Sequence, residues 1–349
     1  MKRSYTYVVF LLAFLCLSAV LAGGCGEEGS RKNAVANEEK EKAEAEEDCV
    51  TIGVIGLING NMVVRDQGWY EQELGTKVKI KEYHTGMEVV DALGKAEIDI
   101  GELGSPPAAA AISHGYKIDV IYVEDIIGAA ETLVVRKDAG ISSIKDLLGK
   151  TVGTPYGSTA HYSLLKAMLL EGMDANAVHV LDLKPKSIYA AWQHGDIDAA
   201  YIWYPVLGQL LADGGAVLTD SGELAGRGII TADVLVARHA FAEKHEAEVQ
   251  KVVDLNIRAT KMLTDGDETA YAAIARQMNM SLEEARQETG KFKYLDPEEQ
   301  AEYLSDVMGH SLNDIADFML HQQLVLSVPE PGEYMKRVEP RYVKEAIRK

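Results

Sequence analysis

The segment 92–106 reads ALGKAEIDIGELGSP, and the segment 191–205 reads AWQHGDIDAAYIWYP. Each passes from the end of a helical pattern through a glycine to an Ile-Asp step and a strand-like run, and each ends on a proline. Two copies alone are weak support for a repeat, because many helix-to-strand loops contain glycine. The shared order still suggests one helix–glycine–strand unit used twice. It predicts an α/β fold with two lobes of similar build.

Alternating strand and helix patterns extend outward from both copies. Strands are predicted at 50–55, 77–83, 98–103, 131–136, 151–153, 197–203 and 233–238. Helices are predicted at 62–74, 86–93, 187–194, 281–290, 297–308 and 312–323. Trp192 lies on one of these helices beside two alanines, which favours a packing role for its ring.

The length of the folded part also favours two lobes. The roughly 300 residues from Cys49 onward exceed what one compact core usually holds. We interpret 131–136 and 233–238 as strands that cross between the lobes. One lobe is then discontinuous and comprises 49–137 and 238–349, while the other is a single insert, 138–237.

The N-terminus has the features of a secretory signal. Lys2 and Arg3 precede an apolar run, 8–22, that is too short and too N-terminal for a permanent membrane span. The run closes on Leu-Ala-Gly-Gly-Cys at 21–25, which resembles a bacterial lipobox and implies acylation of Cys25 after removal of 1–24. An ordinary signal peptide is the alternative. We therefore expect an extracytoplasmic protein that a lipid anchors to the membrane.

A polar segment, 25–48, separates the proposed lipid from the first strand. Nine acidic and four basic residues lie between positions 27 and 48, with almost nothing apolar among them. Such a segment cannot offset its ordering entropy by burial, so a disordered acidic tether is predicted.

Charge and cysteine content exclude several classes of function. Without 1–24 the chain keeps 33 basic and 54 acidic residues, a net charge of −21, which argues against nucleic acid as a partner. The three cysteines are Cys16 in the signal, Cys25 and Cys49, so no disulfide is expected. No CxxC or HExxH spacing occurs, and neither a metal nor another cofactor is predicted.

Two predicted helix starts are candidates for binding an anion. Ser105 begins one after the strand DIGELG, and Ser158-Thr159 begins another after TVGTPYG, with His161 one step further. A helix start offers unpaired N–H groups and partial positive charge, and the hydroxyls add donors suited to the three oxygens of a sulfonate. The alternative is that Ser158 or Thr159 only caps its helix.

Three segments, DIGELGSPPAAAA, SSIKDLLGKTVGTPYGSTAHYSLL and AAWQHGDIDAAYIWYPV, resemble the taurine-binding periplasmic proteins of ABC importers. These belong to a wider family for aliphatic sulfonates, nitrate and thiamine precursors. The resemblance runs from about residue 50 to past residue 323. It implies a type II periplasmic-binding-protein fold, a small ligand gripped between two lobes, hinge closure, a membrane permease as partner, and no catalysis.

The resemblance also implies roles for single residues. Those expected near the sulfonate are Ser105, Ser158, Thr159 and His161. Glu131 and Asp233, at the two crossovers, are the expected partners of the ligand's ammonium, because a buried cation needs a counter-charge. A hinge or capping role is the alternative for both acids.

Tyr201 and Trp203 alternate on one predicted strand, so their rings share a face. They would lie over the ligand's methylenes or its ammonium, unless they belong to the core. The loop 56–62 (GLINGNM) departs from the taurine-like pattern, which leaves the ligand itself open.

Three hypotheses follow. The first is a monomeric binding protein for taurine. The second is the same role for another alkanesulfonate, nitrate or a small zwitterion. The third is an enzyme of the same fold, such as a pyrimidine synthase. An enzyme would need a reactive His or Cys cluster, and Cys49 and His161 are predicted to lie on different lobes.

Overall fold

Two separate sheets form within Cys49–Lys349, the part of the chain that the structure, a computed structural model, describes. The predicted signal 1–24, the lipidation residue Cys25 and the predicted tether 25–48 lie outside the described residues. None of the described helices is long and apolar enough to cross a membrane. Cys49, the one cysteine of the described range, is half-buried at the start of the first strand.

The first sheet contains six strands in the order β11-β4-β10-β3-β1-β2. β1, β2 and β3 run parallel, whereas β10 is antiparallel to both β3 and β4, and β11 is antiparallel to β4. The bounds are β1 (Cys49–Val54), β2 (Lys77–Glu82), β3 (Ile100–Gly104), β4 (Ile118–Ile127), β10 (Ala232–Arg238) and β11 (Phe292–Lys293). The carboxyl ends of β1 and β3 therefore lie at one edge of the sheet, where ligands of open α/β folds gather.

The second sheet contains five strands in the order β7-β6-β8-β5-β9. β6, β7 and β8 are parallel, and β5 is antiparallel to β8 and β9. The bounds are β5 (Glu131–Arg136), β6 (Thr151–Thr154), β7 (His179–Asp182), β8 (Ala199–Trp203) and β9 (Gly215–Asp220). This order matches β2-β1-β3-β10-β4 of the first sheet strand for strand, so the two lobes share one topology.

The helix–glycine–strand unit has the same hydrogen bonds in both lobes. Asp99 Oδ2 accepts a hydrogen bond from the backbone N–H of Thr51 at 2.9 Å. Asp198 Oδ2 accepts the equivalent bond from Thr151 N at 2.8 Å. Each aspartate thus ties the strand that follows it to the neighbouring parallel strand. The repeat suggested by the sequence is present in the structure.

The chain passes between the sheets at two places. The outward passage is 128–130, between β4 and β5, and the return passage ends where β10 begins at Ala232. β5 pairs only within the second sheet, and β10 only within the first. The predicted lobe boundaries at 137 and 237 thus differ from the passages by several residues, because strand pairing decides the lobe to which each strand belongs.

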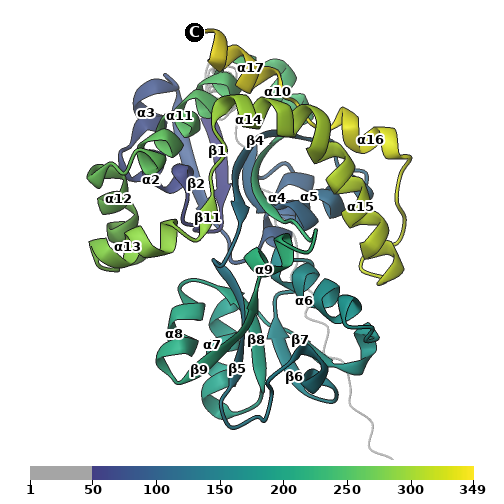
Figure 1. The fold of residues 1–349 in the computed structure, drawn as a ribbon. Helices are drawn as coiled ribbons and strands as arrows, with labels where there is room; N and C mark the ends of the chain where they lie inside the picture. Colours follow the sequence, from purple (N-terminus) through teal and green to yellow (C-terminus); the bar gives the residue numbers. More distant parts are fainter. Residues whose placement is uncertain (1–48) are drawn as a thin grey trace, which may run out of the picture. The chain divides into compact units, whose positions relative to one another are not determined.

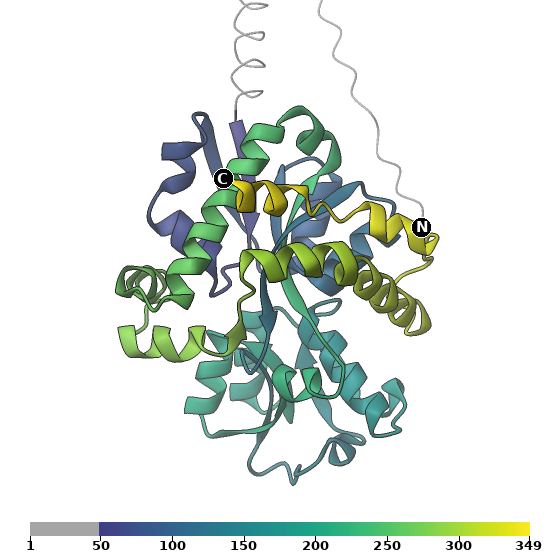
Figure 2. The same cartoon turned by 45° about the horizontal axis from the view of Figure 1, so that its top comes forward.

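Helices of the first lobe come from both ends of the described chain (Figure 1). They are α2 (Gly60–Asp66), α3 (Trp69–Glu73), α4 (Gly86–Gly94), α5 (Ser105–Ser113), α10 (His239–Lys244), α11 (Glu246–Thr264), α12 (Glu268–Met278), α13 (Leu282–Thr289), α14 (Pro297–Glu302), the π-helical turn η3 (Tyr303–Val307), α15 (Met308–His321), α16 (Pro331–Lys336) and α17 (Arg341–Arg348). The C-terminal helices return to this lobe, where α15 and α16 pack against α5 and α17 packs against α11 and α14 (Figure 2).

The second lobe is smaller. Its helices are the 3-10 turns η1 (Ile144–Leu147) and η2 (Ala175–Ala177), α6 (Thr159–Leu170), α7 (Pro185–His194), α8 (Val206–Ala212) and α9 (Ser221–Ala225). Trp192 of α7 is buried in an apolar cluster with Ile188 and Ile197, which confirms its predicted packing role.

Candidate functional site

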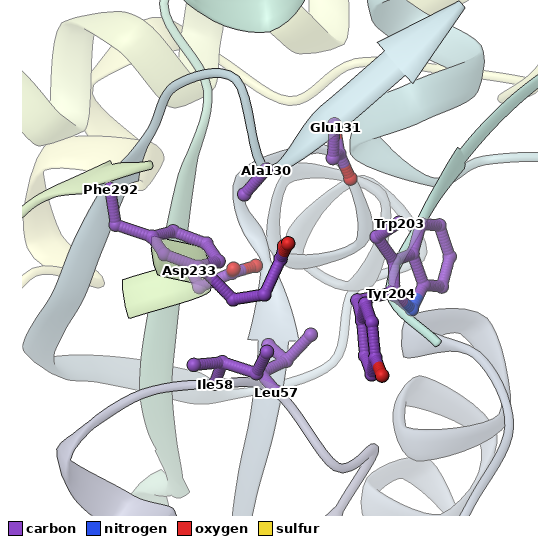
Figure 3. A pocket seen from close by; sticks show the side chains of 9 residues that line it. Leu57, Ile58, Ala130, Glu131, Trp203, Tyr204, Asp233 and Phe292 are labelled. Carbon is purple, nitrogen blue, oxygen red and sulfur yellow. The ribbon is translucent and has the colours of Figure 1, made fainter. Parts of the chain in front are cut away.

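A pocket lies between the lobes, beside the outward passage and the start of β10 (Figure 3). The space between its atoms amounts to about 350 Å³ when open solvent is included, and only about 20 Å³ of it can hold the centre of a water molecule. Its lining comes from both lobes: Leu57, Ile58, Ala130, Glu131, Trp203, Tyr204, Asp233, Glu288 and Phe292. Glu131, Trp203 and Asp233 are the predicted site residues that the structure brings together in this lining.

Glu131 is the first residue of β5 and is 4% exposed. The hydroxyl of Thr159, the first residue of α6, donates to its Oε1. The Ser221 hydroxyl donates to Oε2 at 3.4 Å. Burial raises the pKa of Glu131 to about 7, and these two hydrogen bonds oppose that rise. Near neutral pH the site therefore holds a carboxyl group that is poised between its two protonation states.

Asp233 is the second residue of β10 and is also 4% exposed. Among the described residues, none donates a hydrogen bond to its carboxyl group, although it faces the pocket (Figure 3). Burial, followed by the neighbouring carboxyl groups of Glu131 and Glu102, raises its pKa well above the usual value. A buried acid without a partner at a pocket wall favours a cationic ligand.

Aromatic rings form two walls of the pocket. Trp203 and Tyr204 at the end of β8 face Phe292 of β11 across the hollow (Figure 3). Indole and phenol faces attract a positive charge and also pack against methylene groups. The predicted position of Trp203 over a ligand is compatible with this arrangement.

The loop between β1 and α2 provides the apolar floor. Glu102 fixes this loop, because its carboxylate accepts hydrogen bonds from Ile55 N at 2.9 Å, Asn59 Nδ2 at 3.0 Å and Asn61 Nδ2 at 3.3 Å. Tyr294 donates from its hydroxyl to the carbonyl of Ile58. Leu57 and Ile58 are thereby held against the pocket. The sequence marked this loop as unusual without indicating that a buried glutamate organises it.

The start of α6 has a different role for each predicted residue. The Ser158 hydroxyl caps the helix by accepting from His161 N at 3.1 Å, and it donates to Pro155 O at 2.6 Å. Thr159 reaches the site through Glu131. The His161 ring stacks on Tyr156 with a centroid distance of 4.4 Å and lines another hollow. Of these residues, only Thr159 contacts the pocket lining through its side chain.

Ser105 also makes a structural hydrogen bond, because its hydroxyl accepts from Ala232 N at 3.2 Å. It begins α5, where Pro106 and Pro107 occupy the next two positions and have no N–H group. The α5 start thus offers fewer donors to an anion than the α6 start. Ser105 holds β10 in place beside Asp233 instead of lining the pocket.

Tyr201 lies behind the pocket wall. It is fully buried, and its hydroxyl is 3.0 Å from that of Ser221, which in turn contacts Glu131. Burial raises the pKa of Tyr201, so its hydroxyl stays neutral. Tyr201 supports the Glu131 hydrogen bonds, whereas Trp203, on the same face of β8, lines the pocket.

The pocket lining contains three acids and no Lys, Arg or His. Lys291 lies outside this lining, but its Nζ is 2.7 Å from Glu288 Oε1. Trp203 and Tyr204 also line a separate hollow, which is formed in part by His84, Lys184 and Lys186. Within Cys49–Lys349 no group of His, Cys, Asp or Glu side chains is arranged to hold a metal ion. The geometry therefore suits a ligand with a positively charged group.

Two α/β lobes with a pocket at their connections define a two-lobed ligand-binding protein. The chain belongs to the NMT1/THI5-like family, whose model matches residues 58–270. It is 34% identical over 287 residues to the taurine-binding periplasmic protein of Escherichia coli (strain K12), covering 80% of this chain and 88% of the relative.

Two solved structures share the fold. The alkanesulfonate-binding protein SsuA from Xanthomonas axonopodis pv. citri, bound to MOPS, superposes with a TM-score of 0.70 at 21% identity and covers 84% of this chain and 98% of its own. The periplasmic aliphatic sulphonate binding protein SsuA from Escherichia coli gives 0.66 at 23% identity, covering 82% and 91%. The predicted periplasmic-binding-protein fold is confirmed.

Proposed function

We propose that this protein is the substrate-binding component of an ABC importer and that it captures taurine between its lobes. Family membership and the 34% identical taurine-binding relative support the general role. The ligand itself rests on the chemistry of the pocket. Taurine carries an ammonium group at one end and a sulfonate at the other, joined by two methylenes.

The observation that carries the choice is the unpartnered, buried carboxyl group of Asp233. An ammonium group between Asp233 and Glu131 would lose its hydration water. The two carboxylates would take the place of that water as its partners. The rings of Trp203, Tyr204 and Phe292 would enclose the methylenes and add a cation–π contact. A plain anion such as nitrate or ethanesulfonate would meet three acids and no Lys, Arg or His in this lining.

The sulfonate would bind on the side of α6. Thr159 stands at its first turn and already contacts Glu131. A helix start favours an anion through its partial positive charge and its free N–H groups. In this arrangement the ligand bridges the acids at the passages and the α6 start, and it makes all its contacts only when the lobes are together.

Binding without catalysis is part of the proposal. The acids of the pocket are partners for a cation, and no nucleophile of Cys or His type stands in the lining. By analogy with the periplasmic relative, we place the protein outside the cytoplasm, with Cys25 as its lipid anchor, a membrane permease as its partner, and a monomer as its working form.

Calorimetry with taurine, β-alanine, ethanesulfonate and nitrate tests the proposal. Taurine should bind most tightly, and loss of the amine in ethanesulfonate should cost at least about tenfold in affinity, as expected for an unpaired buried charge. Asp233→Asn should reduce this preference for the amine, while Asp182→Asn, an exposed acid of β7, should not. Equal affinity for ethanesulfonate and taurine would sink the assignment of the ammonium site.

A further inference from the structure

Behind Asp233 lies a second acid that does not line the pocket. Asp125 of β4 stands directly opposite Asp233 in the antiparallel pairing of β4 with β10. Residues opposite each other in such a pair project from the same face of the sheet, with their Cβ atoms about 5 Å apart. The two carboxyl groups are therefore neighbours, one at the pocket and one beneath it.

A β-bulge produces this arrangement. Asp233 pairs with Asp125, whereas the next residue of β10, Val234, pairs with Val123, so Glu124 is an extra residue on β4. Bulges shift the direction of the side chains that follow, and they often lie beside functional sites. Here the bulge places two consecutive acids, Glu124 and Asp125, within the sheet under the pocket.

These acids have no hydrogen-bond partners among the described residues. Both oxygens of Glu124 and both of Asp125 are buried and unpaired, and the two side chains are 1% and 0% exposed. Glu102 of β3 differs, because three N–H groups donate to it. An ionised carboxylate cannot remain buried without donors or a counter-charge at reasonable cost.

The surroundings of the pair are mostly acidic. The titratable groups that face it are Tyr122 and Glu124 on β4, Glu102 on β3, Glu131 on β5, Glu288 on α13, Tyr294 after β11, Tyr70 on α3 and Arg65 on α2. Arg65 is the one cation among them, and no described acid forms a hydrogen bond with its Nε or Nη2. Burial and the facing carboxyl group raise the pKa of Asp125.

We propose that Asp125 and Asp233 share one proton in the ligand-free protein, and that an ammonium group entering the pocket expels this proton to the solvent. The inference rests on the proposed amine-bearing ligand. The exchange is balanced: the ammonium keeps its own protons, the Asp pair loses one, and the buffer takes it up. Asp125 is a positioning residue, because it acts on the ligand through Asp233.

Calorimetry of taurine binding to the intact protein at neutral pH tests the proposal, in phosphate and in Tris, whose ionisation enthalpies differ. The difference in observed heat gives the number of protons released. We expect between about half a proton and one proton per taurine, with affinity rising by up to about tenfold per pH unit through neutral pH. Equal observed heats in the two buffers, with a flat pH profile, would overturn the inference.

Asp125→Asn sharpens the test, because the side chain keeps its size. The variant should still bind taurine, but its proton release should fall well below that of the wild type, to the share that Glu131 gives up near neutral pH. Its pH profile should also become shallower, which a purely structural role would not cause. Asp119→Asn is the matched control, a buried acid of the same strand that is paired with His239 and Arg337 away from the pocket. It should keep the release seen in the wild type. Unchanged release in Asp125→Asn would contradict the proposal.

Failure of the ligand assignment can be recognised separately. If taurine gives no heat in either buffer, the proposed function is wrong, and infrared spectroscopy of the ligand-free protein then decides the present inference. A protonated-carboxyl band should be present at neutral pH and should be weaker in Asp125→Asn. If Asp125→Asn does not fold, the wild-type protein alone still tests the inference. Absence of the protonated-carboxyl band from its spectrum would contradict the shared proton.

Discussion

A Cβ atom placed on Gly104 would lie 2.5 Å from Cγ2 of Thr159, across the boundary between the two lobes. Gly104 ends β3 in the first lobe, and Thr159 begins α6 in the second. A second close approach of the same kind joins Gly157 and Met87. The lobes in this structure are thus in contact directly beside the pocket, and glycine is what permits the contact.

Gly104→Ala should therefore hold the lobes apart. The backbone of Gly104 has a φ of −76°, which alanine adopts without strain, so the effect would come from the collision with Thr159 alone. Overpacking of this kind costs about 1–3 kcal/mol, which corresponds to a loss in taurine affinity of about fivefold or more. Calorimetry measures the loss, and small-angle scattering with saturating taurine should show a larger radius of gyration than for the wild type.

Gly332→Ala serves as the control, because it lies in α16 and its added Cβ would meet nothing within 4 Å. It should bind taurine like the wild type. Wild-type affinity in Gly104→Ala would show that closure does not require this contact.

The ion pair between Lys184 Nζ and Glu88 Oε1, 2.6 Å apart, also joins the lobes. The Lys184 side chain is 60% exposed, so the pair is screened by solvent and contributes about 0.2–1 kcal/mol. Lys184→Met should lower taurine affinity by no more than about fivefold, and the difference should shrink at high salt. Titrations at low and high ionic strength measure this, and a far larger loss would mean that Lys184 contacts the ligand.

Glu131→Gln should change stability in a pH-dependent way. The pKa of Glu131 in the folded protein is about 7, above the usual 4.5, so the folded chain holds a proton that the unfolded chain releases between these values. The wild type then loses stability as pH rises from about 4.5 to about 7, by an amount on the order of 2–3 kcal/mol. Glutamine has no such loss and can still accept from Thr159.

Urea unfolding of both ligand-free proteins tests this at about pH 5 and about pH 8. The unfolding free energy of Glu131→Gln relative to the wild type should be higher at about pH 8 than at about pH 5, by an amount on the order of 2–3 kcal/mol. The taurine affinity of the variant should be lower than that of the wild type. A gap that stays constant across the two pH values would contradict the origin assigned to the shift.

Asp198→Ala tests the repeated strand tie. Removal of the carboxylate leaves the part-buried N–H of Thr151 without its acceptor, which costs about 0.5–1.5 kcal/mol of unfolding free energy. Asp196→Ala, two residues earlier on the exposed surface, should have little effect. Equal unfolding midpoints for the two variants would show that the bond contributes nothing.

Much of the fold follows from the sequence because its strongest signals are local. The Ile-Asp steps at 98–99 and 197–198 predicted the two strands that follow them in the repeat, and both strands are present. Predictions fail where one residue interrupts a longer pattern. The predicted helix 62–74 is two helices, α2 and α3, because Gly68 adopts a left-handed conformation between them.

The site was accessible to sequence analysis only in part, for reasons of distance and ambiguity. A Ser-Thr pair at a helix start has the same sequence pattern whether it caps the helix or binds an anion. In this structure the Ser158 hydroxyl caps α6. Phe292 and Glu288 reach the pocket from a C-terminal segment far along the chain, which no local pattern reveals. The bulge at Glu124 depends on pairing with β10, so two acids within an apolar run gave no sign of their position.

The placement of Glu131 and Asp233 has a consequence for the order of events. Each stands within two residues of a passage between the lobes, Glu131 just after the outward one and Asp233 just after the return. Points near a rotation axis move little when two rigid bodies swing, while points far from it sweep through large arcs. In the proposed closure, Glu131 and Asp233 would therefore already lie close together in the open protein. The amine of the ligand would bind first, and the closing rotation would then bring α6 onto the sulfonate.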